Sequence, residues 1–417
     1  MVEFLVAVGL AVAVFVGFNI GGSSTGVAFG PGVGSRIVRK GTAAALFTLF
    51  ALLGAWTVGR NVIDTMSSEI VAAAAFSPEA SVGVLFFTGT ALLISNLYGV
   101  PASTSMTAVG SIVGLGLATG TLNSALMFTV LSAWIISPLI SLFAGALFGR
   151  YLYPHLNAKL AFGRLQSPLV KVDQGKLLPR LKINKNAASR DLIGSTLVIT
   201  IACYMGFSAG ASNAANAVAP LVGNGALDAS PAILLAVGAM SLGAFTIARR
   251  TLDTVGSDIT DMPILASLIV STVGATIITL LSWLGIPASL AVSTTSCIIG
   301  LGWGRLSRAR TLVEIITPTT EGTSAPAASA SGIAAADADS DTETPVNPTV
   351  GELAEGEIPD PEEQQAPEDA IPAIGEETPM AAGSLFDSAA TARIVVLWVL
   401  TPSMAVAGSY LLFSFLI

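Results

Sequence analysis

Seven long stretches of this chain carry no formal charge and alternate with more polar segments. They lie at 42–58, 83–97, 124–148, 192–207, 231–246, 264–284 and 394–415. Each is near or above the roughly 20 residues that a helix needs to cross a bilayer. Another apolar stretch follows Glu3 without the basic segment or cleavage site of a signal peptide, and is interpreted as the first membrane helix. The pattern predicts an all-α polytopic membrane protein.

The apolar pattern is built from two related halves. Gly21-Gly22-Ser23-Ser24 recurs 189 positions later as Gly210-Ala211-Ser212-Asn213. Pro101-Ala102-Ser103 recurs 186 positions later as Pro287-Ala288-Ser289, and Trp134 recurs as Trp398 after 264 positions. An apolar chain built from two halves with matching Gly/Ser-rich interruptions is typical of secondary transporters.

The positions of the basic residues predict the topology. We place five crossings and one re-entrant hairpin in each half, with the N-terminus outside. This arrangement puts 18 of the 19 Lys and Arg residues on the cytoplasmic side and only Arg60 outside. An odd number of crossings inverts the second half relative to the first, so both termini are predicted to lie outside.

Composition and charge then define the domains. Hydrophobic residues make up 53% of the chain and charged residues 11%, against about 25% in a soluble domain. We predict a first membrane repeat at 1–149, a basic cytoplasmic linker at 150–190 and a second repeat at 191–417. A segment at 311–392 interrupts the second repeat with 17 Asp and Glu and no Lys or Arg, and is predicted to be a disordered cytoplasmic insert.

Two pairs of segments are predicted to break the helices at membrane depth, where unwound backbone must line a cavity or be buried. The first pair is 21–26 and 210–216, and the second is 101–105 and 287–296. Hydroxyls, amides and freed backbone N–H groups at such breaks can surround a small oxyanion. The predicted substrate-binding residues are Ser23, Ser24, Ser103, Thr104, Ser105, Ser212, Asn213, Asn216, Ser289, Ser293 and Thr294.

Other kinds of chemistry have little support in the sequence. Cys203 and Cys297 both lie in apolar segments, without disulfide or metal-ligand spacing. A nucleophile–base set and a cofactor motif are both missing, so an enzyme is not expected. The predicted partners are a small oxyanion and the lipid bilayer, without nucleic acid and without a cofactor.

The paired Gly-rich motifs, the Pro-x-Ser-Thr motif followed by Gly-x-Gly and the Asp-Thr stretches resemble the inorganic phosphate transporter (PiT) family. The resemblance covers both halves, outside the acidic insert. It implies inverted repeats with extracellular termini, ion-coupled phosphate uptake by symport and a homodimer.

The first family motif, Gly-Ala-Asn-Asp-Val-Ala-Asn, is altered in both halves. Ser24 and Asn213 stand at the positions of the family aspartates, which help to hold sodium and phosphate. Val27 replaces the last Asn, which Asn216 retains in the second half. The resemblance makes Ser24 and Asn213 candidates for binding a coupling Na⁺.

The resemblance names two further acidic candidates for ion coupling. Asp64 and Asp253 match the family's acidic position after the first motif. Carboxylates inside a membrane are functional candidates by default. Both residues are therefore candidates for binding Na⁺ or carrying H⁺, and no other metal is expected.

The second family motif, Pro-x-Ser-Thr-Thr-His, departs more in the second half. Met106 replaces the His in the first half, while Leu290 and Ala291 replace both Thr in the second. Ser293 and Thr294 lie about one turn later, so two registers remain open.

Three functions follow from these patterns. The resemblance favours phosphate transport. The altered aspartates also resemble the sulfate-carrying branch of the family, and sulfate needs no proton acceptor. A third alternative, from another class, is a membrane scaffold that does not transport and acts through the acidic insert.

Overall fold

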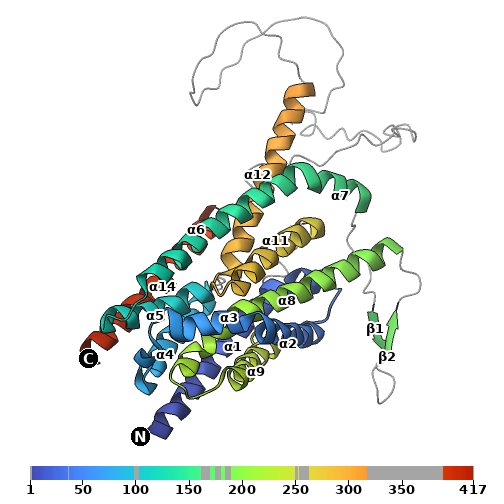
Figure 1. Ribbon diagram of the computed structural model, residues 1–417. Helices are drawn as coiled ribbons and strands as arrows, with labels where there is room; N and C mark the ends of the chain where they lie inside the picture. The colour runs from blue at the N-terminus through green and yellow to red at the C-terminus, as the bar shows by residue number, and fades with distance from the viewer. Residues whose placement is uncertain are drawn as a thin grey trace, which may run out of the picture. The chain divides into compact units, whose positions relative to one another are not determined.

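The computed structural model describes residues 2–35, 37–97, 103–160, 170–173, 180–183, 189–248, 252, 263–316 and 388–416. Long helices dominate it (Figure 1). In the first half they are α1 (Val2–Gly34), α2 (Lys40–Thr57), α3 (Gly59–Asp64), α4 (Pro78–Leu97), α5 (Thr104–Thr119), α6 (Ser124–Leu147) and α7 (Tyr153–Leu160). In the second they are α8 (Ser189–Gly223), α9 (Ala229–Phe245), α11 (Ile264–Trp283), α12 (Leu290–Ile316) and α14 (Ser388–Leu416). Shorter turns are η1 (Thr65–Glu69), η2 (Ala73–Ala75) and η3 (Phe148–Leu152).

The predicted polytopic helical membrane protein is confirmed. Within the described residues, seven helical segments are long and apolar enough to cross a bilayer, and the first is Glu3–Gly34. Helices α5 and α9 are apolar but shorter. Helices α1 and α8 have 33 and 35 residues, about 50 Å each, and therefore exceed the roughly 30 Å hydrocarbon core.

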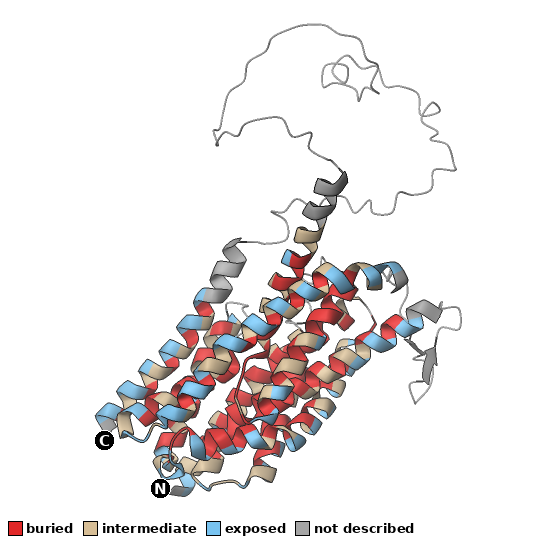
Figure 2. Ribbon diagram, turned by 45° about the horizontal axis from the view of Figure 1, so that its top comes forward, coloured by how far each residue is buried: buried red, intermediate tan, exposed pale blue. Residues whose placement is uncertain are grey.

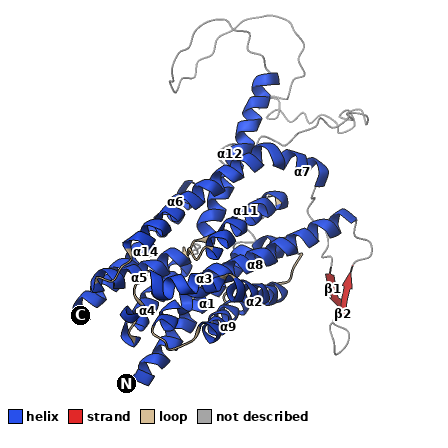
Figure 3. Ribbon diagram, viewed as in Figure 1, coloured by secondary structure: helices blue, strands red, loops and turns tan. Residues whose placement is uncertain are grey.

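One departure from an all-helical chain lies in the predicted linker. Strands β1 (Val170–Asp173) and β2 (Arg180–Ile183) pair antiparallel (Figure 3). Their sequences, Val-Lys-Val-Asp and Arg-Leu-Lys-Ile, alternate apolar and charged residues with the period of two that a strand requires. The prediction overlooked this alternation within a segment considered only for its charge.

The prediction that the first pair of Gly-rich segments breaks the helices was wrong. Helix α1 continues through 21–26, and α8 continues through 210–216. Their glycines serve close packing instead. A Cβ on Gly21 would overlap the carbonyl oxygen of Met240 on α9, and a Cβ on Gly243 of α9 would overlap that of Phe18 on α1.

The same contact occurs between α8 and α2. A Cβ on Gly210 would overlap the carbonyl oxygen of Ala51, and one on Gly54 would overlap that of Phe207. Each of these four residues lies 189 positions from its counterpart in the α1–α9 pair. Small residues allow helix backbones to touch in membranes, so the sequence repeat corresponds to a repeated helix contact.

A second repeated contact joins the outer helices. A Cβ on Gly300 of α12 would overlap the carbonyl oxygen of Leu142 on α6. A Cβ on Gly114 of α5 would lie 2.5 Å from the carbonyl oxygen of Val406 on α14. The two contacts correspond to each other, because Gly114 and Gly300 are 186 positions apart and Leu142 and Val406 are 264 positions apart, the offsets of the sequence repeat. In addition, Trp134 of α6 donates its indole N–H to the carbonyl oxygen of Pro287, at 2.7 Å.

The second pair of predicted breaks, at 101–105 and 287–296, is present within the residues that the structure describes. Helix α12 begins only at Leu290, after a left-handed turn at Gly285 (φ +74°). Pro287 therefore precedes the helix. In the first half, Ser103 is the residue before α5, and residues 98–102 lie outside the described part of the chain.

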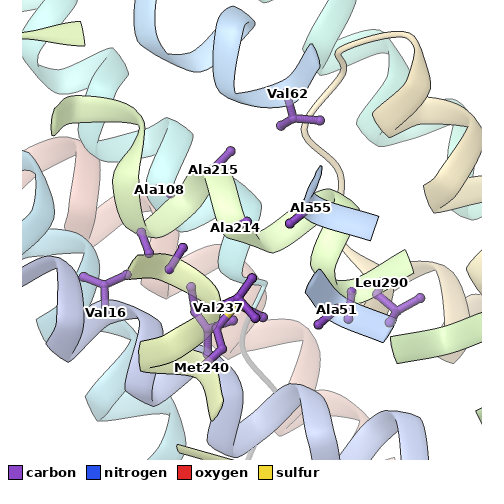
Figure 4. Packing of buried hydrophobic residues seen from close by; sticks show 14 of the residues in the cluster. Val16, Ala51, Ala55, Val62, Ala108, Ala214, Ala215, Val237, Met240 and Leu290 are labelled. Atoms are coloured by element: carbon purple, nitrogen blue, oxygen red, sulfur yellow. The ribbon is translucent and has the colours of Figure 1, made fainter. Parts of the chain in front are cut away.

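Burial follows the pattern of a membrane protein. Small and apolar side chains fill the interior around α1, α8 and α9 (Figure 4). Many residues of α6 and α14 are exposed (Figure 2), and large apolar residues are among them. Cys203 and Cys297 are free and buried.

The chain divides into two compact units. The first is Met1–Leu312 with Phe386–Ile417, and the second is Val313–Leu385, which is described only over 313–316. The predicted disordered insert at 311–392 therefore lies mostly outside the described residues.

Candidate functional site

A small cavity lies where the two halves meet. Its volume is about 20 Å³, above the roughly 10–15 Å³ that one water needs. Its lining residues are Ser23, Ser24, Val27, Thr104, Asn213, Ser289, Leu290 and Ala291. They come from α1, α5, α8 and the start of α12, and none of them carries a formal charge.

Asn213 of α8 is the centre of the polar wall. Its carbonyl oxygen accepts from the Thr104 hydroxyl at 2.7 Å and from the Asn216 amide at 3.2 Å. Its own amide donates to the Ser24 hydroxyl at 3.3 Å. Ser24 and Asn213 are 189 positions apart, so equivalent residues of the two halves contact each other directly.

A second layer of hydrogen bonds lies behind Asn213. The Asn216 amide donates to the Ser105 hydroxyl at 3.2 Å, and the Ser105 and Ser212 hydroxyls are 3.3 Å apart. Ser212 in turn donates to the carbonyl oxygen of Ala288 at 2.7 Å. All of these side chains are buried. The network therefore links α8 to the first residues of α5 and to the segment before α12.

Two helix N-termini meet at the cavity. Thr104 is the first residue of α5, and Leu290 and Ala291 are the first two of α12. The Ser289 hydroxyl accepts from the Val292 N–H at 3.4 Å and so caps α12. The first N–H groups of a helix lack partners within the helix, and the helix dipole is positive at this end. Both features favour an anion.

The cavity is asymmetric with respect to the repeat. On one side, Asn213 and Asn216 bond to Thr104 and Ser105. On the other side, the offset of 189 positions makes Ser24 and Val27 the equivalents of Asn213 and Asn216. The offset of 186 positions makes Leu290 and Ala291 the equivalents of Thr104 and Ser105. Ser24, Val27, Leu290 and Ala291 line the cavity. Val27, Leu290 and Ala291 cannot make side-chain hydrogen bonds, so the cavity is lined by Thr104 and Asn213 of the network together with apolar residues at positions where the other half has network residues.

Several buried polar atoms near the cavity have no partner among the described residues. They are the hydroxyls of Ser103 and Ser293 and the carbonyl oxygen of the Asn216 side chain. A buried polar atom without a partner costs about 1–3 kcal/mol. These atoms are therefore available for hydrogen bonds to a ligand or to water.

The structure brings together most of the predicted site residues. Five line the cavity: Ser23, Ser24, Thr104, Asn213 and Ser289. Ser105, Ser212 and Asn216 form the layer behind them, and Ser103 is buried at the start of α5. The remaining two, Ser293 and Thr294, do not line the cavity.

The structure also fixes the register of the second Ser-Thr motif. Leu290 and Ala291 line the cavity at the positions equivalent to Thr104 and Ser105. Thr294 instead donates to the carbonyl oxygen of Leu290 at 2.9 Å, within its own helix, and its methyl group faces Gly274 of α11. A shift of one turn therefore does not bring the later hydroxyls to the cavity.

The two acidic candidates are not part of the described cavity. Asp64 is exposed at the end of α3, and Asp253 lies outside the described residues. The lining residues that we did not predict are Val27, Leu290 and Ala291. The sequence did contain a signal for them, because each stands where the other half has a hydrogen-bonding residue.

Enlarging Ala291 is expected to block transport. A leucine there adds three heavy atoms to a cavity of about 20 Å³, which fills it at little cost to the helix. Uptake in proteoliposomes should fall at least tenfold. The control is Ala45→Leu, at an exposed position on α2, which should keep normal uptake. Equal uptake by both variants would show that the substrate does not pass this cavity.

Membrane-spanning helices around a buried polar cavity are typical of a multi-pass membrane transport protein. The sequence model of the phosphate transporter family matches residues 20–409, and the chain belongs to that family.

Curated relatives and one solved structure are similar to this chain. The sulfate permease CysP of Bacillus subtilis is 29% identical over 294 residues, which cover 70% of this chain and 76% of the permease. The chloroplastic inorganic phosphate transporter 2-1 of Arabidopsis thaliana is 24% identical, over 72% of this chain and 67% of its own length. The fold resembles that of a sodium-dependent phosphate transporter, with a TM-score of 0.66, 17% identity and 99% coverage of both chains.

Proposed function

We propose that this protein is a secondary transporter that carries inorganic phosphate across the cell membrane by symport. The observation that carries the proposal is the uncharged cavity at the N-termini of α5 and α12, lined by hydroxyls and an amide. Such a site stabilises an oxyanion with dipoles and hydrogen bonds. The site has no fixed positive charge. Such a charge would slow the release of a transported anion.

The two halves are proposed to be inverted repeats that rock around the cavity. The repeated contacts α1–α9 and α8–α2, related by 189 positions, support this proposal. The N-terminus of α1 and the C-terminus of α14 lie at the same end of the helical bundle (Figure 1), as an inverted duplication requires. In line with the positive-inside rule, we propose that both termini lie outside, and that the basic linker and acidic insert lie in the cytoplasm. A homodimer is proposed from the family resemblance alone.

We further propose that uptake is coupled to sodium or protons. A weak sodium site could form from neutral oxygens around Asn213 and Ser24, which stand where the family has aspartates. Asn216 contributes a buried side-chain oxygen with no partner among the described residues. Proton coupling would require a titratable group, for which Asp64 and Asp253 remain the candidates.

Sulfate is the second candidate substrate, and one observation favours it. Phosphate near neutral pH carries a proton that needs an acceptor, whereas sulfate carries none. The cavity has no carboxylate, and the Asn213 oxygen already accepts from Thr104 and Asn216. A site with few free acceptors therefore suits an anion without a proton.

Counterflow in proteoliposomes tests these proposals. Vesicles loaded with unlabelled phosphate or sulfate should accumulate the same labelled anion, under an imposed sodium or proton gradient. We expect saturable phosphate exchange that a gradient accelerates. Exchange of sulfate alone would select the second candidate, and exchange of neither anion would contradict the proposed transport function.

Deletion of 317–387 separates transport from the scaffold alternative. The transporter should retain its uptake after this deletion, because the cavity residues all lie in the other unit of the chain. A scaffold that acts through its acidic insert would instead lose its function while never accumulating anion.

A further inference from the structure

An arginine cluster lies where the C-terminal end of α6 meets α12, away from both chain termini (Figure 1). Arg150 follows α6 within the turn η3, and Arg305 and Arg308 belong to α12. The Arg150 guanidinium donates to the Ser307 hydroxyl at 2.9 Å, and that of Arg308 donates to the backbone oxygen of Arg150 at 3.2 Å. Positive side chains from two helices are thus held next to each other.

Helix packing forces this proximity. Gly304 of α12 contacts the backbone of α6, since a Cβ there would overlap the oxygen of Ala146 and lie 2.9 Å from the Arg150 nitrogen. A Cβ on Gly149 would likewise overlap the oxygen of Leu301. Because these backbones touch, Arg150 and Arg308 start from neighbouring turns of two packed helices.

The charge of Arg150 and Arg308 is not neutralised within the described part of the chain. Their hydrogen bonds go to a serine hydroxyl and a backbone oxygen, and neither guanidinium contacts a carboxylate there. Each guanidinium has five N–H donors in a planar fork that matches a phosphate. The pair therefore has the chemistry of a phosphate-group site.

An exposed apolar stripe leads along α6 to this cluster. Leu139, Phe143 and Leu147 follow one another at intervals of four residues and are 49%, 58% and 58% exposed. Tyr151 continues the stripe at 61% exposed, and the Arg150 guanidinium lies 5.8 Å from the centre of its ring. Exposed aromatic residues beside basic ones are typical of the lipid headgroup level.

We propose that Arg150 and Arg308 bind the phosphate of an anionic phospholipid whose acyl chain lies along the Leu139–Phe143–Leu147 stripe. The continuity of charge with an exposed apolar stripe favours a lipid over a soluble anion, which would gain nothing from the stripe. The predicted topology places this end in the cytoplasmic leaflet, where anionic lipids attract basic residues. The site is separate from the transport cavity and does not depend on the substrate proposed for it.

Thermal unfolding of the full chain in detergent tests the proposal. Phosphatidylglycerol should raise the melting temperature by about 3 °C or more, and phosphatidylcholine should raise it less. Arg150→Gln with Arg308→Gln should remove this difference between lipids, whereas Arg150→Lys with Arg308→Lys should retain part of it. The control is Arg60→Gln on α3, another arginine over an aromatic ring, Trp56, which should keep the full difference.

Four results would overturn the proposal. The first is equal stabilisation by both lipids, and the second is an equal loss of the difference between lipids in Arg60→Gln. The third is stabilisation by inorganic phosphate that disappears in the double Gln variant. The fourth is a lipid effect that appears only after deletion of 317–387. The third would assign the arginines to a soluble anion and the fourth to the acidic segment of this chain. If the double Gln variant does not fold, native mass spectrometry of Arg308→Gln alone should show fewer bound phosphatidylglycerol molecules than the wild type.

Discussion

Replacing Asn213 by alanine is expected to abolish uptake of the anion. The change removes the acceptor for Thr104 and Asn216 and the donor to Ser24, so buried polar groups lose their partners. Each such loss costs about 1–3 kcal/mol. Because these groups form the wall of the cavity, uptake should fall by at least about tenfold, and more in combination with Ser103→Ala.

The control for this prediction is Asn61→Ala. The exposed Asn61 amide also donates one hydrogen bond between segments, to the backbone oxygen of Trp283 at 2.7 Å, but neither residue lines the cavity. This variant should transport at nearly the wild-type rate. Labelled-anion uptake should be measured together with the melting temperature of each variant. Normal uptake by a folded Asn213→Ala protein would remove this residue from the site.

Replacing Gly21 or Gly210 by alanine should destabilise the protein strongly. The added methyl group would overlap a backbone oxygen of the neighbouring helix, Met240 or Ala51, and backbone cannot move aside as a side chain can. Overpacking of this kind typically costs about 1–3 kcal/mol, and contact with backbone should reach the upper end. We expect a lower melting temperature in detergent and reduced expression for both variants.

Gly238→Ala on α9 is the matched control for the glycine variants. It lies on a helix of the same packed pair, but nothing lies within 4 Å of the position of its Cβ. Alanine is favoured over glycine in a helix by about 1 kcal/mol, so this variant should be as stable as the wild type or more stable. If Gly21→Ala matched Gly238→Ala, the motif glycines would not be required for packing, and a role in unwinding the helix would again have to be considered.

The sequence predicted the membrane helices well, because an apolar stretch long enough to cross a bilayer has few alternatives to a helix. It also identified the residues around the cavity, since Ser24, Thr104 and Asn213 all lie in the repeated motifs. Its largest error concerned the glycines of the first motif. A Gly/Ser-rich segment is compatible both with unwound backbone and with tight helix contact, and only the neighbouring helix distinguishes the two.

The sequence by itself therefore determined the helical membrane class, the duplication and the family, because hydropathy and repeated motifs are properties of the linear chain. Only the tertiary structure decided where the cavity lies. Leu290 and Val27 looked like simple losses from the family motifs, but their contacts depend on α1 and α12 meeting across the two halves. Thr104 and Asn213 of the polar network line the same cavity as Val27, Leu290 and Ala291, and only packing between helices far apart in the chain brings these residues together.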